Sequence, residues 1–271
     1  MKKYYRNSVR LTIAGRDVAA GASKFGGCPD VPADFVWPYY EGETFDGIKK
    51  NRPLSFLAQI NCAQAAAYDT EKKLPETGML YFFYDLETQC WGYDPDHKGC
   101  AKVIWSESGE LAPAVFPEDL ADTYRLPQLG IGFASVTEVP EAEEFEMRFG
   151  EDIADHPEDY AEYMMLGLED EDDICHKLLG FANSLQGMMI EECEMVAQGH
   201  YCGGPVKITT SERLVMQREC REWNLLLQLD TVEDGDYALE FGDCGRIYFY
   251  IKDEDLKARR FDKCWLVLQC G

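Results

Sequence analysis

The chain has 271 residues, of which 46% are hydrophobic, so it can bury a core and is not a disordered chain. Its formal net charge is -24, because 50 acidic residues outweigh 26 basic ones. This charge repels nucleic-acid phosphates and anionic lipids, so we expect neither a nucleic-acid partner nor membrane binding. The same charge favours a basic protein as a partner.

The cysteines bear on the compartment. There are eleven, an odd number, and no two are spaced as C-x-x-C, a pattern that favours neither a zinc ribbon nor a redox dithiol. The N-terminal residues do not resemble a signal peptide, and no apolar run approaches the ~20 residues of a membrane span. We therefore expect a cytoplasmic protein with free thiols and no structural disulfide.

The first element in chain order is a stiff segment, SKFGGCPDVPADFVWP, at residues 23–38. Its three prolines fix φ and push the residue before each of them to extended geometry, while Gly26 and Gly27 permit a tight turn. The pattern predicts a preorganised extended arm that ends at Trp37. We expect this arm to seal one end of the core. The alternative is that Trp37 lines a ligand groove, since rigid aromatic side chains are good anchors.

Strands follow this arm. PLSFLAQI at 53–60, GMLYFFYD at 78–85 and KVIWSE at 102–107 are rich in apolar and aromatic residues, and a short alanine-rich helix is predicted between the first two. Because the first two runs do not alternate between apolar and polar residues, we expect them to be buried on both faces.

An acidic segment comes next. Residues 138–173 contain sixteen acidic residues and one basic residue, Arg148. A helix is predicted from Pro157, since proline and acidic residues suit a helix N-terminus. We interpret the segment as a solvated helical linker rather than a binding surface. The run EDEDD lacks the alternating ligands and the glycine of a calcium loop.

The second half of the chain repeats features of the first. WNLLLQLD at 223–230, GRIYFYIK at 245–252 and CWLVLQC at 264–270 parallel the three earlier strands. The match places Gln59 with Gln228 and Gly78 with Gly245. We therefore predict an α+β fold that is internally duplicated, with two similar half-domains of largely antiparallel sheet and short helices. The repeats would span about 1–137 and 174–271, joined by the acidic linker 138–173.

Candidate site residues follow from this duplication. Gln59 and Gln228 lie among apolar residues, and a buried glutamine needs hydrogen-bond partners. Either each side chain holds the backbone of a neighbouring loop, or the two amides line a cleft between the repeats. His176 begins HKLLG, which matches the SKFGG of the first repeat, and joins Trp37, Gln59 and Gln228 as a candidate groove residue.

Catalytic signatures are absent from the sequence. It contains no G-x-S-x-G, H-E-x-x-H, G-x-x-x-x-G-K-[ST] or G-x-G-x-x-G. The four histidines are scattered, and His200 with Cys202 has no specific metal spacing. We identify no catalytic residue, no metal site and no cofactor.

Several motifs in this order, from SKFGGCPDVPADFVWP through PLSFLAQIN and LPETGMLYFFYD to WNLLLQLD and GDCGRIYFYIKDEDL, resemble the YwqG-like proteins, a bacterial family without an established function. The resemblance begins at Ser23 and reaches the C-terminal residues. It implies a single cytoplasmic α+β domain over 1–271 with an internal duplication. It supplies no catalytic residues, and the occurrence of some members near toxin–immunity loci implies a partner-binding role.

Two hypotheses about function result. The first is a non-catalytic binding protein, of the immunity type or a regulatory partner of a basic protein. The alternative is an enzyme or small-molecule binder that uses a cleft between the two repeats.

Overall fold

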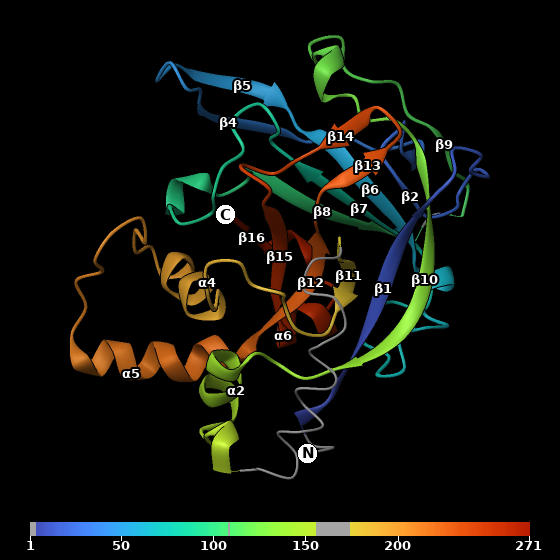
Figure 1. The fold of residues 1–271 in the computed structure, drawn as a ribbon. Helices are drawn as coiled ribbons and strands as arrows, with labels where there is room; N and C mark the ends of the chain where they lie inside the picture. The colour runs from blue at the N-terminus through green and yellow to red at the C-terminus, as the bar shows by residue number, and fades with distance from the viewer. Residues whose placement is uncertain (1–3, 108, 156–173) are drawn as a thin grey trace.

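Ten strands form one antiparallel sheet in the computed structural model of this chain, which describes residues 4–107, 109–155 and 174–271 (Figure 1). In sheet order the strands are β16 (Trp265–Gln269), β15 (Arg246–Lys252), β12 (Trp223–Leu229), β11 (His176–Leu179), β1 (Arg6–Ala14), β10 (Leu129–Glu138), β2 (Lys24–Phe25), β6 (Ser55–Asn61), β7 (Met79–Tyr84) and β8 (Ala101–Ser106). Three two-stranded sheets join β3 (Asp30–Val31) to β9 (Ala112–Pro113), β4 (Tyr39–Glu43) to β5 (Lys49–Pro53), and β13 (Val232–Asp234) to β14 (Tyr237–Leu239).

The helices are short. They are α1 (Cys62–Ala65), α2 (Ala142–Phe149), α4 (Ile190–Ala197), α5 (Thr210–Glu219) and α6 (Asp253–Lys257), with 3-10 turns η2 (Pro95–His97), η3 (Asp122–Tyr124), η4 (Ile153–Asp155), η5 (Cys220–Glu222) and η6 (Phe261–Lys263). The helix α4 packs against β12, and α5 lies beside α4 (Figure 1). Thr209 and Glu212 form a capping box that sets the start of α5.

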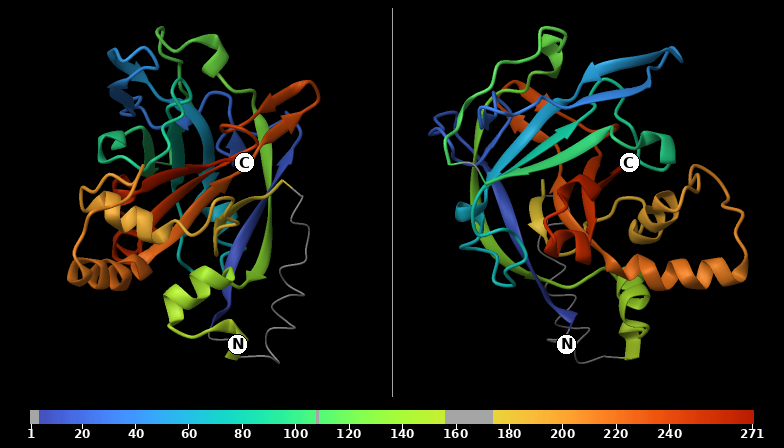
Figure 2. Two further views of the ribbon diagram at one scale, coloured as in Figure 1. Left: turned by 60° about the vertical axis from the view of Figure 1, so that its left-hand side comes forward. Right: turned by 180° about the vertical axis from the view of Figure 1, so that it is seen from behind.

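The sheet curves so strongly that its two ends face each other (Figures 1 and 2). The ring of Phe82 on β7 packs edge-on against that of Phe249 on β15, with 5.3 Å between centroids. The backbone N–H of Leu268 on β16 donates to the carbonyl oxygen of Trp91, in the loop between β7 and β8, at 2.9 Å. Both ends of the sheet therefore share one hydrophobic core.

The predicted α+β fold with two half-domains is wrong. The chain forms one continuous, mostly antiparallel sheet, and β1 and β10 lie at its middle, paired from Arg6 opposite Glu138 to Ala14 opposite Gly130. The physical reason is burial. Since β6, β7 and β12 are buried along nearly their whole length, the apolar faces of the two ends of the sheet are covered by each other rather than within separate halves.

The acidic segment is only partly described. Its first part contains the end of β10 and the helix α2, whose Phe145 ring packs against Tyr4 with 4.7 Å between centroids. The helix predicted from Pro157 falls in residues 156–173, outside the described residues.

Two further expectations concern thiols and membranes. All eleven cysteines lie in described residues and are free thiols. Within the described ranges, no helix has both the length and the apolar composition needed to span a bilayer. The cytoplasmic location stays a prediction.

Candidate functional site

Trp37 lies at the end of the predicted arm and is half-buried. Its indole N–H donates to the carbonyl oxygen of Leu54 at 2.9 Å. Its ring packs edge-on against Phe83 of β7 at 5.3 Å and against Phe116 at 5.8 Å. These contacts place the arm against the core, with part of the tryptophan ring accessible to water.

Gln59 on β6 is fully buried, and both ends of its side-chain amide have partners within the chain. Its Nε2 donates to the carbonyl oxygen of Ala22 and to Asp30 Oδ2, both at 2.8 Å, and its Oε1 accepts from the backbone N–H of Asp30 at 2.8 Å. Asp30 also forms a buried ion pair with Lys24 at 2.9 Å. Burial alone would raise the pKa of Asp30, but the hydrogen bonds from Lys24 and Gln59 outweigh it and lower that pKa.

Gln228 on β12 is also fully buried. Its Nε2 donates to the carbonyl oxygen of Cys175 at 2.9 Å, and its Oε1 accepts from the backbone N–H of Asn183 at 2.9 Å. His176 on β11 is buried, and its Nδ1 accepts from the backbone N–H of Asp230 at 3.1 Å. Burial lowers the pKa of His176 to about 4, so the imidazole is neutral at pH 7.

Among the described residues, no hydrogen bond joins any two of these four predicted residues, and their role in a groove stays a prediction. Four strands separate β6 from β12 in the sheet order. The amides of Gln59 and Gln228 hold neighbouring loops, so their hydrogen-bonding groups are already used within the chain.

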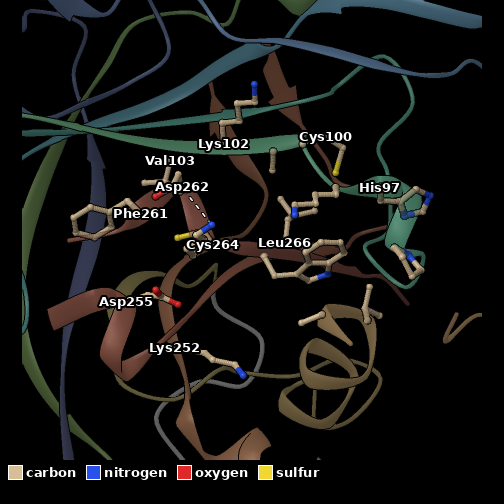
Figure 3. A pocket seen from close by; sticks show the side chains of 18 of the residues that line it. His97, Cys100, Lys102, Val103, Lys252, Asp255, Phe261, Asp262, Cys264 and Leu266 are labelled. Carbon is tan, nitrogen blue, oxygen red and sulfur yellow. Dashed lines mark ion pairs between the residues drawn. The ribbon is translucent and has the colours of Figure 1, made fainter. Parts of the chain in front are cut away.

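A cavity of about 650 Å³ lies instead where the two ends of the sheet meet (Figure 3). One wall is the edge strand β8 with the turn before it, and the opposite wall is the first part of β16. The α6–η6 segment, the end of α4, Trp223 of β12 and Lys252 of β15 complete the lining. Figure 3 shows Cys100, Val103 and Leu266 around the cavity, with Lys252 and Asp255 further along the wall, while the side chain of Lys102 points away from Leu266.

The topology explains this cavity. Among the described residues, each of β8 and β16 pairs with one neighbouring strand, so its other edge is free to face the opposite strand. At one end Phe261 of η6 lies against Trp105 of β8, with 6.5 Å between ring centroids. At the other end Trp265 Nε1 donates to the carbonyl oxygen of Gly92 at 2.8 Å. The space between the edges of β8 and β16 is therefore closed at both ends by these contacts, and the cavity lies between them.

Gly92 permits this close approach. Its φ is +91°, and a Cβ there would lie 1.9 Å from the carbonyl oxygen of Leu266. Any other residue would both strain the backbone and push β16 away from the loop between β7 and β8.

The cavity concentrates positive charge in an acidic protein. Its lining contains four lysines, Lys98, Lys102, Lys252 and Lys263, and two aspartates, Asp255 and Asp262. Lys252 pairs with Glu194 at 2.7 Å, and Lys263 pairs with Asp262 at 3.7 Å. Lys102 Nζ donates to the carbonyl oxygen of Tyr39 at 3.3 Å. Among the described residues, neither Lys98 nor Lys102 forms an ion pair with a carboxylate.

The thiols and the imidazole of the cavity are not activated. A hydrogen bond with Cys90, together with burial, raises the pKa of Cys100 well above its ordinary value. Burial does the same to the pKa of Cys264. Both stay protonated at neutral pH, whereas a cysteine nucleophile reacts as the thiolate. Burial lowers the pKa of His97, whose Nδ1 accepts from the backbone N–H of Gly92 at 3.1 Å.

In the ranges that the structure describes, no cluster of three or more His, Cys, Asp or Glu side chains is placed to hold a metal ion.

Sequence reasoning missed this cavity, although it identified both strands that form its walls. The runs 102–107 and 264–270 were predicted as strands, and they correspond to β8 and β16. Their composition carries no signal that the two edges face each other. A local signal was the lysine content of 98–102 and 252–263 in a chain of net charge -24.

Comparison with known proteins adds one finding. The family model described as a domain of unknown function, DUF1963, matches residues 23–270, which is nearly the whole chain. No curated protein matches the chain. The match agrees with the resemblance to an uncharacterised family, while the YwqG-like label stays a prediction.

Proposed function

Because the chain belongs to the DUF1963 family, whose function is unknown, we propose a function from the geometry of its cavity. The chain is a binding protein for a small molecule that has an apolar body and an anionic group. The observation that carries this proposal is the cavity of about 650 Å³ between β8 and β16, in which lysines outnumber acidic residues although the whole chain has a net charge of -24.

The shape and the walls suit an apolar body. Known small-molecule pockets enclose ~300–1,000 Å³ and are mostly apolar, with a few polar groups that orient the ligand. Here Val103, Phe261, Trp265 and Leu266 supply apolar surface from both sides of the gap. Two strands and a short turn hold these side chains, so the walls are formed before a ligand enters.

The anionic group would be recognised by Lys98, since the side chain of Lys102 points away from the cavity and donates to the carbonyl oxygen of Tyr39. Lys98 directly follows the turn η2, and among the described residues no carboxylate neutralises its side chain. A carboxylate or phosphate of the ligand would provide that partner.

The same geometry supports binding over cysteine-based catalysis. The raised pKa values of Cys100 and Cys264 leave no thiolate at neutral pH, and the Nδ1 of His97 is already used by Gly92.

The proposal is tested by titrating the protein with a panel of aryl and alkyl carboxylates and phosphates, each matched with a neutral alcohol of the same carbon skeleton. The readout is the indole N–H signal of Trp265 in a ¹⁵N-labelled sample, assigned with Trp265→Phe. We expect saturable shifts with anionic members and at least about tenfold weaker binding of the alcohols, because the alcohols lack the charge that pairs with lysine.

The variant Lys98→Gln should lose at least about tenfold in affinity. Lys49→Gln, which removes the same charge from an exposed position on β5, is the matched control and should bind normally. A panel in which no member shifts Trp265, or in which alcohols bind as tightly as anions, would overturn the proposal.

A basic protein partner is the second candidate function, and the net charge of -24 favours it. An immunity-type or regulatory role would take this form. The test is association with a purified candidate encoded beside this chain, measured at low and high salt. Complexes that are insensitive to salt, or no complex with any basic neighbour, would count against it.

A further inference from the structure

A second pocket, of about 210 Å³, lies between the first half of α4 and the last residues of β16. Its lining comes from four stretches that are distant in sequence: the loop 91–93, the loop 186–188 with Glu192 of α4, Cys202, and residues 267–269 of β16. It therefore brings together two motifs from loops that are far apart in sequence, WGYDPDHKG and GHYCGG.

Backbone hydrogen bonds hold these stretches in place. The N–H of Cys202 donates to the carbonyl oxygen of Tyr93 at 2.8 Å, and the N–H of Leu268 donates to that of Trp91 at 2.9 Å. The Oε1 of Gln269 accepts from the N–H groups of Leu185 and Gln186 at 2.9 and 3.0 Å. The pocket is thus built by fixed segments rather than by one loop.

One acid of the pocket lacks a partner. On α4, Glu191 binds Arg213 at 3.2 Å and Glu194 binds Lys252 at 2.7 Å. Within the described residues, Glu192 between them has neither an ion pair nor a side-chain hydrogen bond, and no lysine or arginine lines the pocket. Burial raises the pKa of Glu192 to about 7, as expected for a carboxyl group without a nearby cation.

Two aromatic residues line the pocket together with Glu192. Trp91 is 37% exposed, and Tyr93 lies two residues further along. Edge-to-face contacts with Tyr201 at 5.6 Å and with His97 at 5.3 Å fix the Tyr93 ring. The glycine at 203 leaves room for these rings, since a Cβ there would lie 2.3 Å from the Tyr201 hydroxyl.

We propose that the pocket formed by Trp91, Tyr93 and Glu192 binds an organic cation, an ammonium or guanidinium group. The aromatic faces attract a cation through their quadrupoles, and the carboxylate supplies the opposite charge. The net charge of -24 raises the local concentration of any such cation. This site is distinct from the cavity between β8 and β16, whose lysines select the opposite charge.

Two sources can present this chemistry: a free amine, or a lysine or arginine side chain of a basic protein. A volume of about 210 Å³ is enough for the head group of either.

The first experiment compares choline with its neutral isostere, 3,3-dimethylbutan-1-ol, by calorimetry and by the indole N–H signal of Trp91. We expect choline to bind at least about tenfold more tightly than the alcohol. Glu192→Gln and Trp91→Leu should each weaken choline binding at least about tenfold. Glu233→Gln, which removes the same charge from an exposed position on β13, is the control and should leave binding unchanged. Equal binding of choline and the alcohol, or unchanged binding by Glu192→Gln, would overturn the proposal.

A stability measurement separates this role from a structural one. Because Glu192 is an unpaired and partly buried acid, Glu192→Gln should keep or raise the melting temperature at pH 8, whereas loss of a structural contact would lower it. A lower melting temperature together with normal choline binding would contradict the inference.

The second experiment distinguishes the two sources. Butylammonium is compared with a blocked peptide, Gly-Gly-Lys-Gly-Gly, and with the same peptide carrying arginine. Tighter binding of a peptide, by at least about tenfold, identifies a protein side chain as the ligand. Tighter binding of butylammonium identifies a free amine. Failure of all three cations to bind would reject the site, while leaving the anion-binding cavity untouched.

Discussion

The two buried glutamines provide the clearest comparison between regions of this molecule. Gln59 lies opposite Lys24 on β2 and Tyr81 on β7, and Gln228 lies opposite Lys177 on β11 and Tyr248 on β15. In each region the glutamine accepts the backbone N–H of one residue in a neighbouring segment, and the tyrosine hydroxyl donates to the carbonyl oxygen of the same residue. That residue is Asp30 of β3 in the first region and Asn183, in the loop after β11, in the second.

The two regions differ in the charge and the exposure of this residue. Asp30 is buried, ionised and paired with the buried Lys24, whereas Asn183 is neutral and exposed. Lys177 pairs instead with Glu138 of β10 at 2.9 Å. The same hydrogen-bond frame is thus completed by an ion pair in one region and by a neutral amide in the other. The stability of the first region therefore depends more on a single side chain, that of Asp30.

The largest expected effect is that of Asp30→Ala, which leaves Lys24 buried without its carboxylate. Breaking a buried ion pair by removing one partner costs ~3–5 kcal/mol. Urea unfolding should show a loss of this size. Asp34→Ala, which removes an exposed acid from the same arm, is the control and should change stability by less than ~0.5 kcal/mol. A loss below ~1 kcal/mol for Asp30→Ala would show that the ion pair does not set the difference between the regions.

Trp37→Ala tests whether the arm seals the first region. Truncation of a buried tryptophan costs ~3–5 kcal/mol, and since Trp37 is half-buried we expect a loss at the lower end of that range, ~3 kcal/mol. The midpoint of urea unfolding measures this loss. Val36→Ala, at an adjacent side chain that is 79% exposed, provides the reference. An unchanged midpoint for Trp37→Ala would favour a role for the tryptophan in a ligand groove.

In the second region, the pH dependence of stability should carry the signature of His176. Its pKa falls from 6.5 to about 4 on folding, so the unfolded chain binds more protons between these values. This contribution is fully present above pH 6.5, declines as the pH falls, and amounts to a loss of ~3 kcal/mol by pH 4. The nearby charges of Asp230 and Arg246 act in opposite directions on this pKa.

The measurement is unfolding at a series of pH values between 4 and 7.5, for the wild type and for His176→Asn. The asparagine amide oxygen can still accept from the backbone N–H of Asp230 but does not titrate. We expect the variant to lose part of the pH dependence. Identical slopes in both proteins would mean that His176 is not the group responsible.

Asn183→Ala should have the smallest effect. It removes a 3.3 Å hydrogen bond from Gln228 Nε2, which keeps the carbonyl oxygen of Cys175 as its partner. The exposed site also admits water, so we expect a loss of ~0.5–1.5 kcal/mol in the free energy of unfolding. A loss as large as that of Asp30→Ala would erase the contrast between the two regions.

The strands of the two ends could be predicted from sequence alone because their signal is local. The runs 78–85, 223–230 and 245–252 are continuous stretches of apolar and aromatic residues, and β7, β12 and β15 coincide with them to within a residue or so. The burial of Gln59 and Gln228 followed from their apolar neighbours in the same way. By contrast β10, in which partly exposed and exposed residues predominate, has no such run and was not identified.

The candidate cavity depended on information that no local pattern contains. It exists because the sheet curves until β8 and β16 face each other, which places Val103 and Leu266 in one lining although 163 positions separate them in the chain. The pocket of Glu192 likewise depends on hydrogen bonds that join Trp91 to Leu268 and Tyr93 to Cys202. The composition of these segments predicts neither that β8 faces β16 nor that these hydrogen bonds form.

The sequence by itself determined the apolar strands at the two ends of the sheet, the burial of Gln59 and Gln228, and the acidic character that disfavours nucleic acids. Only the tertiary structure decided that these strands join one sheet instead of two half-domains, because the choice rests on long-range pairing of β1 with β10 and on the contact between Phe82 and Phe249. Periodicity specifies that a strand has an apolar face, but many surfaces can cover that face. The partner is selected by the packing of the whole chain.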